Sequence, residues 1–292
     1  MKSLTKRAVS SHVPRVSVLT PIYNTNPAHL REMIESILAQ TFTDFEFLIL
    51  NDSPDNTEIE QIVREYMAKD KRIKYSKNDS NMGITPSRNK LLKMARGEYV
   101  AIFDHDDISV PTRLAQEVEY LDLHPQVGVV SGFIENFGAD VGVRIVPEFD
   151  TDIKIIMTDK CCVWHTAAMI RKSVLVNNNV EYEEYYSPCE DYRLWSQLMS
   201  VTNFHNLQTV LVKYRVFANQ TSIQQKSRMD TMHRAVQLDI INRFPAYWNA
   251  WLESDASTTR FRLRFFGIPL LKVKHNRVLL FDFIPLFKIK WR

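Results

Sequence analysis

Glycine is scarce in this chain of 292 residues, which contains only 7. The first is Gly83, so no glycine-rich turn follows the first expected strand. A Rossmann dinucleotide site needs G-x-G-x-x-G at that place, and a P-loop needs G-x-x-x-x-G-K followed by Ser or Thr. Both kinds of phosphate site are therefore excluded. A sheet that binds phosphate here must neutralise it by other means, such as a divalent cation.

Cysteine and long apolar runs are also scarce. Cys161, Cys162 and Cys189 are an odd number with no disulfide framework, which indicates a reducing, cytoplasmic compartment. A zinc site from these cysteines and His165 lacks the C-x-x-C spacing that such sites use. No run approaches the ~20 apolar residues of a transmembrane helix. Residues 1–14 are basic and polar without an apolar core, so we expect a flexible N-terminus and no signal peptide.

Charge is distributed unevenly along the chain. Of the formal net charge of +3, residues 261–292 contribute +7, which leaves −4 for the rest. A nucleic-acid binder more often carries basic patches on its folded body, so we expect no nucleic-acid partner. An acidic body with a basic, aromatic tail instead indicates a tail that meets an anionic surface.

Apolar periodicity predicts alternating strands and helices up to Asp107. The expected strands cover residues 15–21, 45–50, 73–75 and 99–103, and the expected helices cover residues 27–40, 57–68 and 85–95. Such alternation implies right-handed crossovers and a mainly parallel sheet flanked by helices. The predicted fold class is therefore α/β and Rossmann-like.

The pattern is less regular after Asp107. Ser109 and Pro111 are expected to open a helix that ends at His124, and strands are expected at residues 127–130 and 167–170. Residues 132–152 read as hairpins or loops, and Glu190 opens a further helix. We expect a catalytic domain over 15–225, with halves at 15–107 and 108–225. A C-terminal helix and a basic, aromatic appendage would occupy 226–292.

Carboxylates stand at the ends of two expected elements. Asp104, Asp106 and Asp107 follow the apolar strand at Tyr99 to Phe103, where they could hold a cation or form only a solvated turn. Glu190 and Asp191 begin a helix, where negative charge is favoured by the helix dipole alone. A general base is the alternative for that pair.

Several motifs occur together in one order. They are V-S-V-x-x-P-x-Y-N at residues 16–24, Q-T-F at 40–42, Asp52, N-x-G-x-x-x-x-R-N at 81–89, G-E-Y at 97–99, D-H-D-D at 104–107 and E-D-x-x-L-W at 190–195. In this order the chain resembles the family 2 glycosyltransferases of the GT-A fold, such as those of bacterial surface-polysaccharide and lipopolysaccharide synthesis. The resemblance covers about residues 15–215.

The resemblance implies a donor site for a nucleotide sugar, with a uridine nucleotide expected. Pro21 and Tyr23 would lie against the base, and Asp52 would accept a hydrogen bond from uracil N3, unless it only caps a turn. Arg88 would contact the nucleotide or its phosphates. His105 would lie in the donor site, either as an added ligand or as a packed residue.

The resemblance also implies the metal and the base. Asp106 would bind Mn²⁺ or Mg²⁺ directly, Asp104 would reach the ribose or the metal through water, and Asp191 would be the catalytic base. Four further residues are candidate acceptor or sugar contacts: Trp164, His165, Glu190 and Trp195. The tryptophans are otherwise core aromatics, and His165 is otherwise a structural histidine.

Transfer with inversion needs one carboxylate as base and a cation for the leaving diphosphate. The sequence therefore predicts an inverting transferase that moves a hexose or N-acetylhexosamine to a glycan or lipid-linked glycan. The chain lacks the glycine-rich loop of a sugar nucleotidyltransferase, which disfavours that alternative. The other alternative is an inactive nucleotide-sugar-binding scaffold. Many relatives carry a His where this chain has Phe217, and His165 or Gln220 are candidates to replace it.

The C-terminal tail contains the same sequence pattern twice. Ile268-Pro269-Leu270 and Ile284-Pro285-Leu286 each follow aromatic residues and precede alternating lysines. Strand-like alternation and prolines disfavour a long helix, so we expect hairpins or short interfacial segments. Such a tail suits an anionic membrane at the cytoplasmic face, although packing on a protein surface is the alternative.

Overall fold

The computed structural model describes residues 12–217, 224–254, 259–265, 268–274, 277–280 and 284–288. Residues 1–11, which make up most of the N-terminus expected to be flexible, lie outside the described part. The chain divides into two compact units, residues 1–239 and residues 240–292. Each unit is described by itself.

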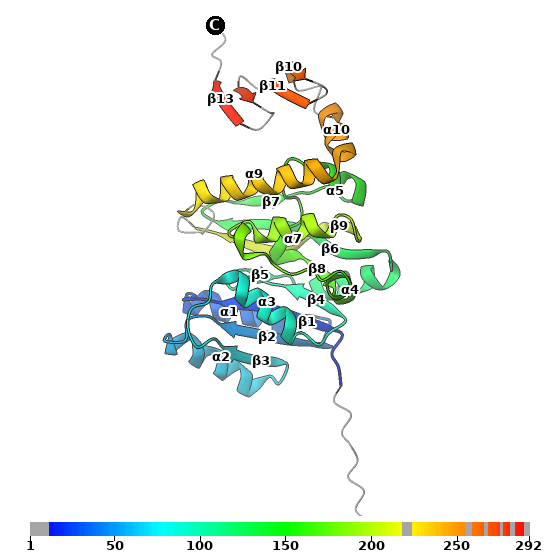
Figure 1. The fold of residues 1–292 in the computed structure, drawn as a ribbon. Coiled ribbons are helices and arrows are strands. Elements are labelled where there is room, and N and C mark those ends of the chain that lie inside the picture. Colours follow the sequence, from blue (N-terminus) through cyan, green and yellow to red (C-terminus); the bar gives the residue numbers. More distant parts are fainter. Residues whose placement is uncertain are drawn as a thin grey trace, which may run out of the picture. The chain divides into compact units, whose positions relative to one another are not determined.

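Four parallel strands and three helices form the first part of unit 1 (Figure 1). The elements are β1 Val16–Ile22, α1 Pro27–Leu38, β2 Phe45–Asn51, α2 Thr57–Lys69, β3 Ile73–Lys77, α3 Ile84–Met94 and β4 Tyr99–Ile102. The strand order is β3-β2-β1-β4, and every pair in it is parallel. The predicted α/β class and parallel half-sheet are confirmed.

Burial explains why these strands read as continuous apolar runs. All seven residues of β1 and all seven of β2 are buried, as a parallel sheet covered on both faces requires. Helix α1 buries one stripe, Leu30, Met33, Ile34 and Ile37, against the sheet. Its N-cap is Asn26, whose Oδ1 accepts a hydrogen bond from the backbone N–H of Ala28 at 2.9 Å.

The remainder of unit 1 extends the same sheet with mixed pairing. The order continues β4-β8-β6-β9-β5, and only β6 and β9 are parallel there. The elements are β5 Ile108–Ser109, α4 Arg113–Leu123, β6 Val127–Gly138, β7 Gly142–Arg144, α5 Asp150–Ile156, η1 His165–Ala167, β8 Met169–Arg171, α6 Lys172–Asn177, η2 Glu184–Tyr186, α7 Glu190–Leu198, β9 Asn203–Val216 and α9 Lys226–Arg243.

Several elements differ from the sequence-based expectation. Strand β6 continues to Gly138, and α5 begins at Asp150 inside the stretch expected to be irregular. The β6–β7 hairpin agrees with the hairpins or loops expected there. Strand β9 was not predicted, because its Asn, Gln and Thr residues hide the apolar pattern until it pairs with β6. Helix α4 begins at Arg113, after the short strand β5.

Unit 2 contains helix α10, Pro245–Ser254, and a separate antiparallel sheet. The strands run in order as β10 Thr259–Phe265, β11 Ile268–Lys274, β12 Arg277–Leu280 and β13 Ile284–Lys288. The hairpins expected in the tail are therefore present as a four-stranded sheet. Among the described helices, none has both the length and the hydropathy needed to cross a membrane.

A buried ion pair fixes the end of β4. Arg113 and Glu117 of α4 are both fully buried, and their side chains are 3.2 Å apart. The Arg113 Nη2 also donates to the carbonyl oxygens of Ile102, at 2.9 Å, and Ala168, at 3.3 Å. One guanidinium therefore connects α4 to β4 just before the acidic turn.

Replacing Arg113 with Leu should destabilise the protein by about 3 to 5 kcal/mol, because Glu117 and two carbonyl groups lose a buried partner. Urea unfolding followed by tryptophan fluorescence measures this change. Arg64→Leu is the control and should cost at most about 1 kcal/mol, since Arg64 is 54% exposed and its partner Glu60 keeps an ion pair with Lys77 at 2.9 Å. Equal effects of the two substitutions would contradict the role assigned to Arg113.

Candidate active site

The candidate site lies at the carboxyl ends of the parallel strands. After β1 the chain passes outward through β2 and β3 and then returns to β4 on the other side of β1. Tyr23 follows β1, Asp52 follows β2, and Asp104 lies just beyond β4. Ligands of open α/β sheets bind at such a switch point, outside the carboxyl ends of the strands.

The residues expected to meet the nucleotide base have different exposures. Pro21 is buried within β1, opposite Leu50 of β2, whereas Tyr23 is 48% exposed. Asp52 is buried, and its Oδ1 accepts hydrogen bonds from Asn78 Nδ2 at 2.6 Å and from the Met82 N–H at 2.9 Å. Its Oδ2 accepts from the Gly83 N–H at 2.8 Å.

Asp52 thus holds the loop that leads into α3. Gly83, at the N-cap of that helix, has a φ of 90°, a backbone conformation that residues other than glycine rarely adopt. The turn-capping alternative for Asp52 is therefore present in the structure. Recognition of a uracil by the same carboxylate stays a prediction.

Arg88 of α3 connects three elements of the site. Its Nη1 donates to Glu190 Oε1 of α7 at 2.5 Å, and its Nη2 donates to Asp104 Oδ1 at 3.1 Å. The guanidinium carbon lies 5.7 Å from the ring centre of Tyr182. Burial lowers the pKa of Arg88, but Glu190 and Asp104 outweigh it and raise that pKa above its ordinary value. The side chain is a permanent cation between two carboxylates.

The acidic turn contains carboxylates of two kinds. Asp107 is fully buried; its Oδ2 accepts from Thr166 Oγ1 at 2.8 Å, and its Oδ1 accepts from the Arg215 N–H at 2.9 Å. Arg215 also donates from Nε to the Asp106 carbonyl oxygen at 2.8 Å. Asp107 therefore anchors the turn to η1 and β9, while Asp104 and Asp106 are half-buried.

Asp104 and Asp106 form the candidate cation site. Burial raises the pKa of Asp106, and the Asp104 carboxylate adds to that rise. Burial would also raise the pKa of Asp104, but Arg88 and two histidines hold it below its ordinary value. A cation would relieve the repulsion between the two carboxylates. The Nδ1 atom of His105 is buried without a protein partner.

The protein groups alone do not complete a metal shell. Within residues 12–217 and 224–254, no three His, Cys, Asp or Glu side chains cluster as metal ligands. The considered zinc site would need such a cluster of Cys161, Cys162, Cys189 and His165, and these described residues do not form one. Mg²⁺ is ordinarily held by one or two carboxylates, with waters and substrate phosphates completing the shell. Asp104 and Asp106 fit that pattern of ligation.

Glu190 and Asp191 begin α7. Burial and the neighbouring Glu190 raise the pKa of Asp191 to about 6, although Arg88 opposes the rise. The Asp191 Oδ1 accepts a hydrogen bond from the Tyr192 N–H at 2.7 Å. Glu190 is 5% exposed, and its Oε2 has no protein partner, so a ligand hydroxyl could donate to it.

The Arg88 side chain, which donates hydrogen bonds to both Asp104 and Glu190, joins the acidic turn to the start of α7. Burial raises the pKa of Tyr214, and Asp104, Asp106, Asp107 and Asp191 all contribute to that rise. The Asp104 charge also contributes to the raised pKa of Asp191. Charges influence each other in this way only over short distances. The structure therefore brings the candidate metal ligands and the candidate base together.

The remaining candidates line the interior behind the site. His165 Nε2 lies 2.9 Å from the Tyr182 hydroxyl, and burial lowers the pKa of His165 to about 3. Trp195 is fully buried 6.0 Å from the His165 ring, which favours the core-aromatic alternative for it. Trp164 is half-buried, and its Nε1 has no protein partner. Phe217 occupies the position where the resemblance implies a His, and the considered substitute Gln220 lies outside the described residues.

Sequence reasoning missed Tyr182. This residue contacts both Arg88 and His165, and Asn89 holds its backbone through Nδ2 to the carbonyl at 2.8 Å and Oδ1 to the N–H at 2.9 Å. Tyr182 lies in an irregular segment without periodicity. The one residue of the sequence that could have pointed to Tyr182 was Asn89. It ends the motif at residues 81–89, but no role was predicted for it.

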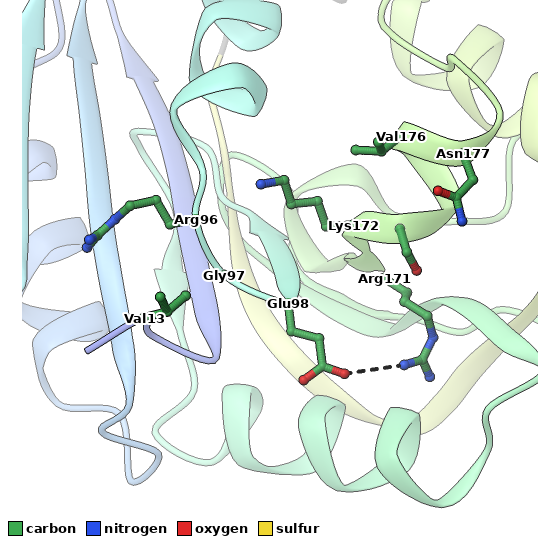
Figure 2. Close-up of a pocket in the computed structure, with 9 residues that line it drawn as sticks. Val13, Arg96, Gly97, Glu98, Arg171, Lys172, Val176 and Asn177 are labelled. Atoms are coloured by element: carbon green, nitrogen blue, oxygen red, sulfur yellow. Dashed lines mark ion pairs between the residues drawn. The ribbon is translucent and has the colours of Figure 1, made fainter. Parts of the chain in front are cut away.

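A hollow of about 450 Å³ lies at the opposite edge of the sheet (Figure 2). Val13 precedes β1, and Gly97 and Glu98 precede β4. Arg171 is the last residue of the antiparallel β8, and Lys172 begins α6. This edge holds the amino ends of the parallel strands. A second hollow, of about 530 Å³, lies beside α3 and is lined by Asn89, Lys93, Glu181 and Glu184. Of the two, it is the one next to the segment that carries Tyr182.

Comparison with known proteins agrees with this geometry. Residues 17–177 match the family model described as glycosyl transferase family 2. An uncharacterised glycosyltransferase of Methanocaldococcus jannaschii is 34% identical over 210 residues, which cover 70% of this chain and 71% of that one. The putative glycosyltransferase EpsE of Bacillus subtilis is 37% identical over 138 residues, 46% of this chain and 49% of that one.

Two solved structures share the fold. One is TarS 1–349 of S. aureus in complex with UDP-GlcNAc, with a TM-score of 0.67 and 21% identity over 83% of this chain and 73% of that one. The other is the mannosyltransferase PcManGT of Pyrobaculum calidifontis in complex with GDP-Man and Mn²⁺, with a TM-score of 0.60 and 16% identity over 86% and 77%. The chain thus belongs to glycosyl transferase family 2 and has the GT-A fold.

Proposed function

We propose that this protein is a metal-dependent, inverting glycosyltransferase that uses a nucleotide sugar, most simply a UDP-hexose or UDP-N-acetylhexosamine. The observation that supports the proposal is the link from Asp104 through Arg88 to Glu190, the residue that precedes Asp191. The known proteins of the same fold support the donor class, since TarS binds UDP-GlcNAc and PcManGT binds GDP-Man with Mn²⁺.

In this mechanism Asp191 accepts the proton of the acceptor hydroxyl as its oxygen attacks the anomeric carbon. The new C–O bond forms on the face opposite the nucleoside diphosphate, and the bond to the diphosphate breaks. With a pKa of about 6, Asp191 is mostly ionised at pH 7 and still basic enough to share the proton. A bound Mn²⁺ or Mg²⁺ on Asp106 and Asp104 would supply positive charge for the leaving diphosphate.

The remaining assignments complete the donor and acceptor sites. Tyr23 and Pro21 would border the base, and Arg88 would contact the phosphates. The free Oε2 of Glu190 would accept from a sugar or acceptor hydroxyl. We propose a glycan or lipid-linked glycan as acceptor in surface-polysaccharide or lipopolysaccharide synthesis. The protein would work at the cytoplasmic face of a membrane, held there by its C-terminal tail.

Turnover of a panel of UDP- and GDP-sugars, with and without Mn²⁺, tests the proposed reaction. Metal-dependent release of nucleoside diphosphate from one donor is the expected result. Donor binding without any release would instead identify a nucleotide-sugar-binding scaffold.

The proposal divides the roles of two carboxylates. Asp191→Asn should lower transfer by about 10²- to 10⁴-fold, the usual contribution of a general base, and leave UDP binding unchanged. Asp106→Asn should abolish the increase in UDP affinity that Mn²⁺ produces. Calorimetric titration and initial rates measure these effects, with Glu119→Gln, an exposed residue on α4, as control. Equal loss of UDP binding in both variants would refute the division.

The base should also appear in the pH profile. Transfer should rise with pH through an inflection near 6 and level above about pH 7, as Asp191 loses its proton. Glu190→Gln removes the like charge that raises the Asp191 pKa, so the inflection should move to lower pH. Initial rates between pH 5 and 8 at saturating Mn²⁺ measure it. A profile that is flat from pH 5 to 7 would argue against Asp191 as the base.

A further inference from the structure

The four-stranded sheet of unit 2 sorts its residues into two faces. Residues directly opposite each other in an antiparallel pair share a face, and successive residues of a strand alternate between faces. The register pairs Phe261 with Val273, Leu263 with Leu271, and Val278 with Phe287. Since Val273 also pairs with Val278, these apolar positions belong to one continuous face.

The other face carries the charged residues. The register places Arg262 opposite Lys272, Lys274 opposite Arg277, and Arg277 opposite Lys288. It also places the apolar Leu279 opposite Lys272. We call this the basic face. The four strands contain no Asp or Glu, because the one acidic residue after position 260 is Asp282, which lies in the sequence between β12 and β13.

Such a register is unfavourable in isolation. Like charges directly opposite each other in an antiparallel pair destabilise it, and this small sheet has three such pairs in adjoining strands. Within the four strands, no residue of opposite charge offsets them. An anionic surface against this face would convert the repulsion into attraction, so binding would also stabilise the sheet.

The basic positions lie on several strands. Neighbouring strands lie about 4.8 Å apart and residues of a strand about 3.3 Å apart, so the basic positions form a two-dimensional pattern. A headgroup layer of anionic phospholipid also presents its charge in two dimensions.

We propose that the basic face of the β10–β13 sheet binds the anionic phospholipid headgroups of a bilayer. This inference rests on the membrane contact of the proposed function and assigns it to one face of the sheet. The proposed attraction is electrostatic. Binding therefore depends on lipid charge and weakens as salt concentration rises.

Sedimentation of the full chain with vesicles tests the proposal, using phosphatidylcholine alone and phosphatidylcholine mixed with phosphatidylglycerol. Binding should require phosphatidylglycerol. Lys272→Gln should weaken it about fivefold, and Lys272→Glu about thirtyfold, since each lost or reversed charge acts near the surface. Lys71→Glu, an exposed residue before β3 in unit 1, makes the same change of charge and should bind as the unaltered chain does.

Lys272→Glu also separates binding from folding. The substitution places a Glu opposite Arg262, which should favour the pairing of β10 with β11. Weaker vesicle binding with undiminished β-sheet circular dichroism would support the proposal. Unchanged vesicle binding by Lys272→Glu, or equal binding to uncharged vesicles, would overturn it.

Binding is measured without donor or acceptor, so its outcome is independent of sugar transfer. The transferase proposal fails only in the donor-turnover measurement, and the lipid proposal fails only in the vesicle measurement. Tight binding to a soluble polyanion such as heparin, with no binding to phosphatidylglycerol vesicles, would assign the basic face to a polymer and overturn the lipid proposal.

Discussion

The ion pairs of Arg88 are the constraint on which the candidate site depends. One buried guanidinium holds Asp104, just past the end of β4, and Glu190, at the start of α7. These residues are 86 positions apart in the chain; Asp104 lies just beyond a strand of the parallel half-sheet, and Glu190 is the first residue of a helix. A permanent cation at this place allows two carboxylate-bearing elements to approach each other. Burial and the Glu190 charge nevertheless raise the pKa of Asp191 to about 6, against the opposing charge of Arg88.

The rest of unit 1 supports that arrangement. Arg113 donates a hydrogen bond to the carbonyl oxygen of Ile102 at the end of β4, and Asp107 accepts hydrogen bonds from Thr166 and Arg215 that hold the acidic turn. Asp52 secures the loop that begins α3 and thereby positions Arg88. Each of these contacts uses a charged side chain to stabilise the fold. The half-buried carboxylates of Asp104 and Asp106 and the free oxygen of Glu190 are the groups that remain for ligands.

Sequence alone predicted the parallel half of the fold, because strands β1, β2 and β4 are buried on both faces and read as uninterrupted apolar runs. It did not predict β9, whose polar residues become strand residues only through pairing with β6. The ends of the predicted strands pointed to Asp52, Asp104 and Asp106 as candidate site residues. Periodicity could not separate Asp107, an anchor, from its neighbours, nor reveal Tyr182, since both roles arise from contacts with residues far along the chain.

The central claim is that one carboxylate, Asp191, activates the acceptor for a single displacement at the anomeric carbon. The anomeric configuration of the first product tests this claim most directly. With a donor of known configuration, proton NMR of the product formed in the earliest turnovers should show the opposite configuration. A product that retains the configuration of the donor would require a second displacement at that carbon and would contradict the account.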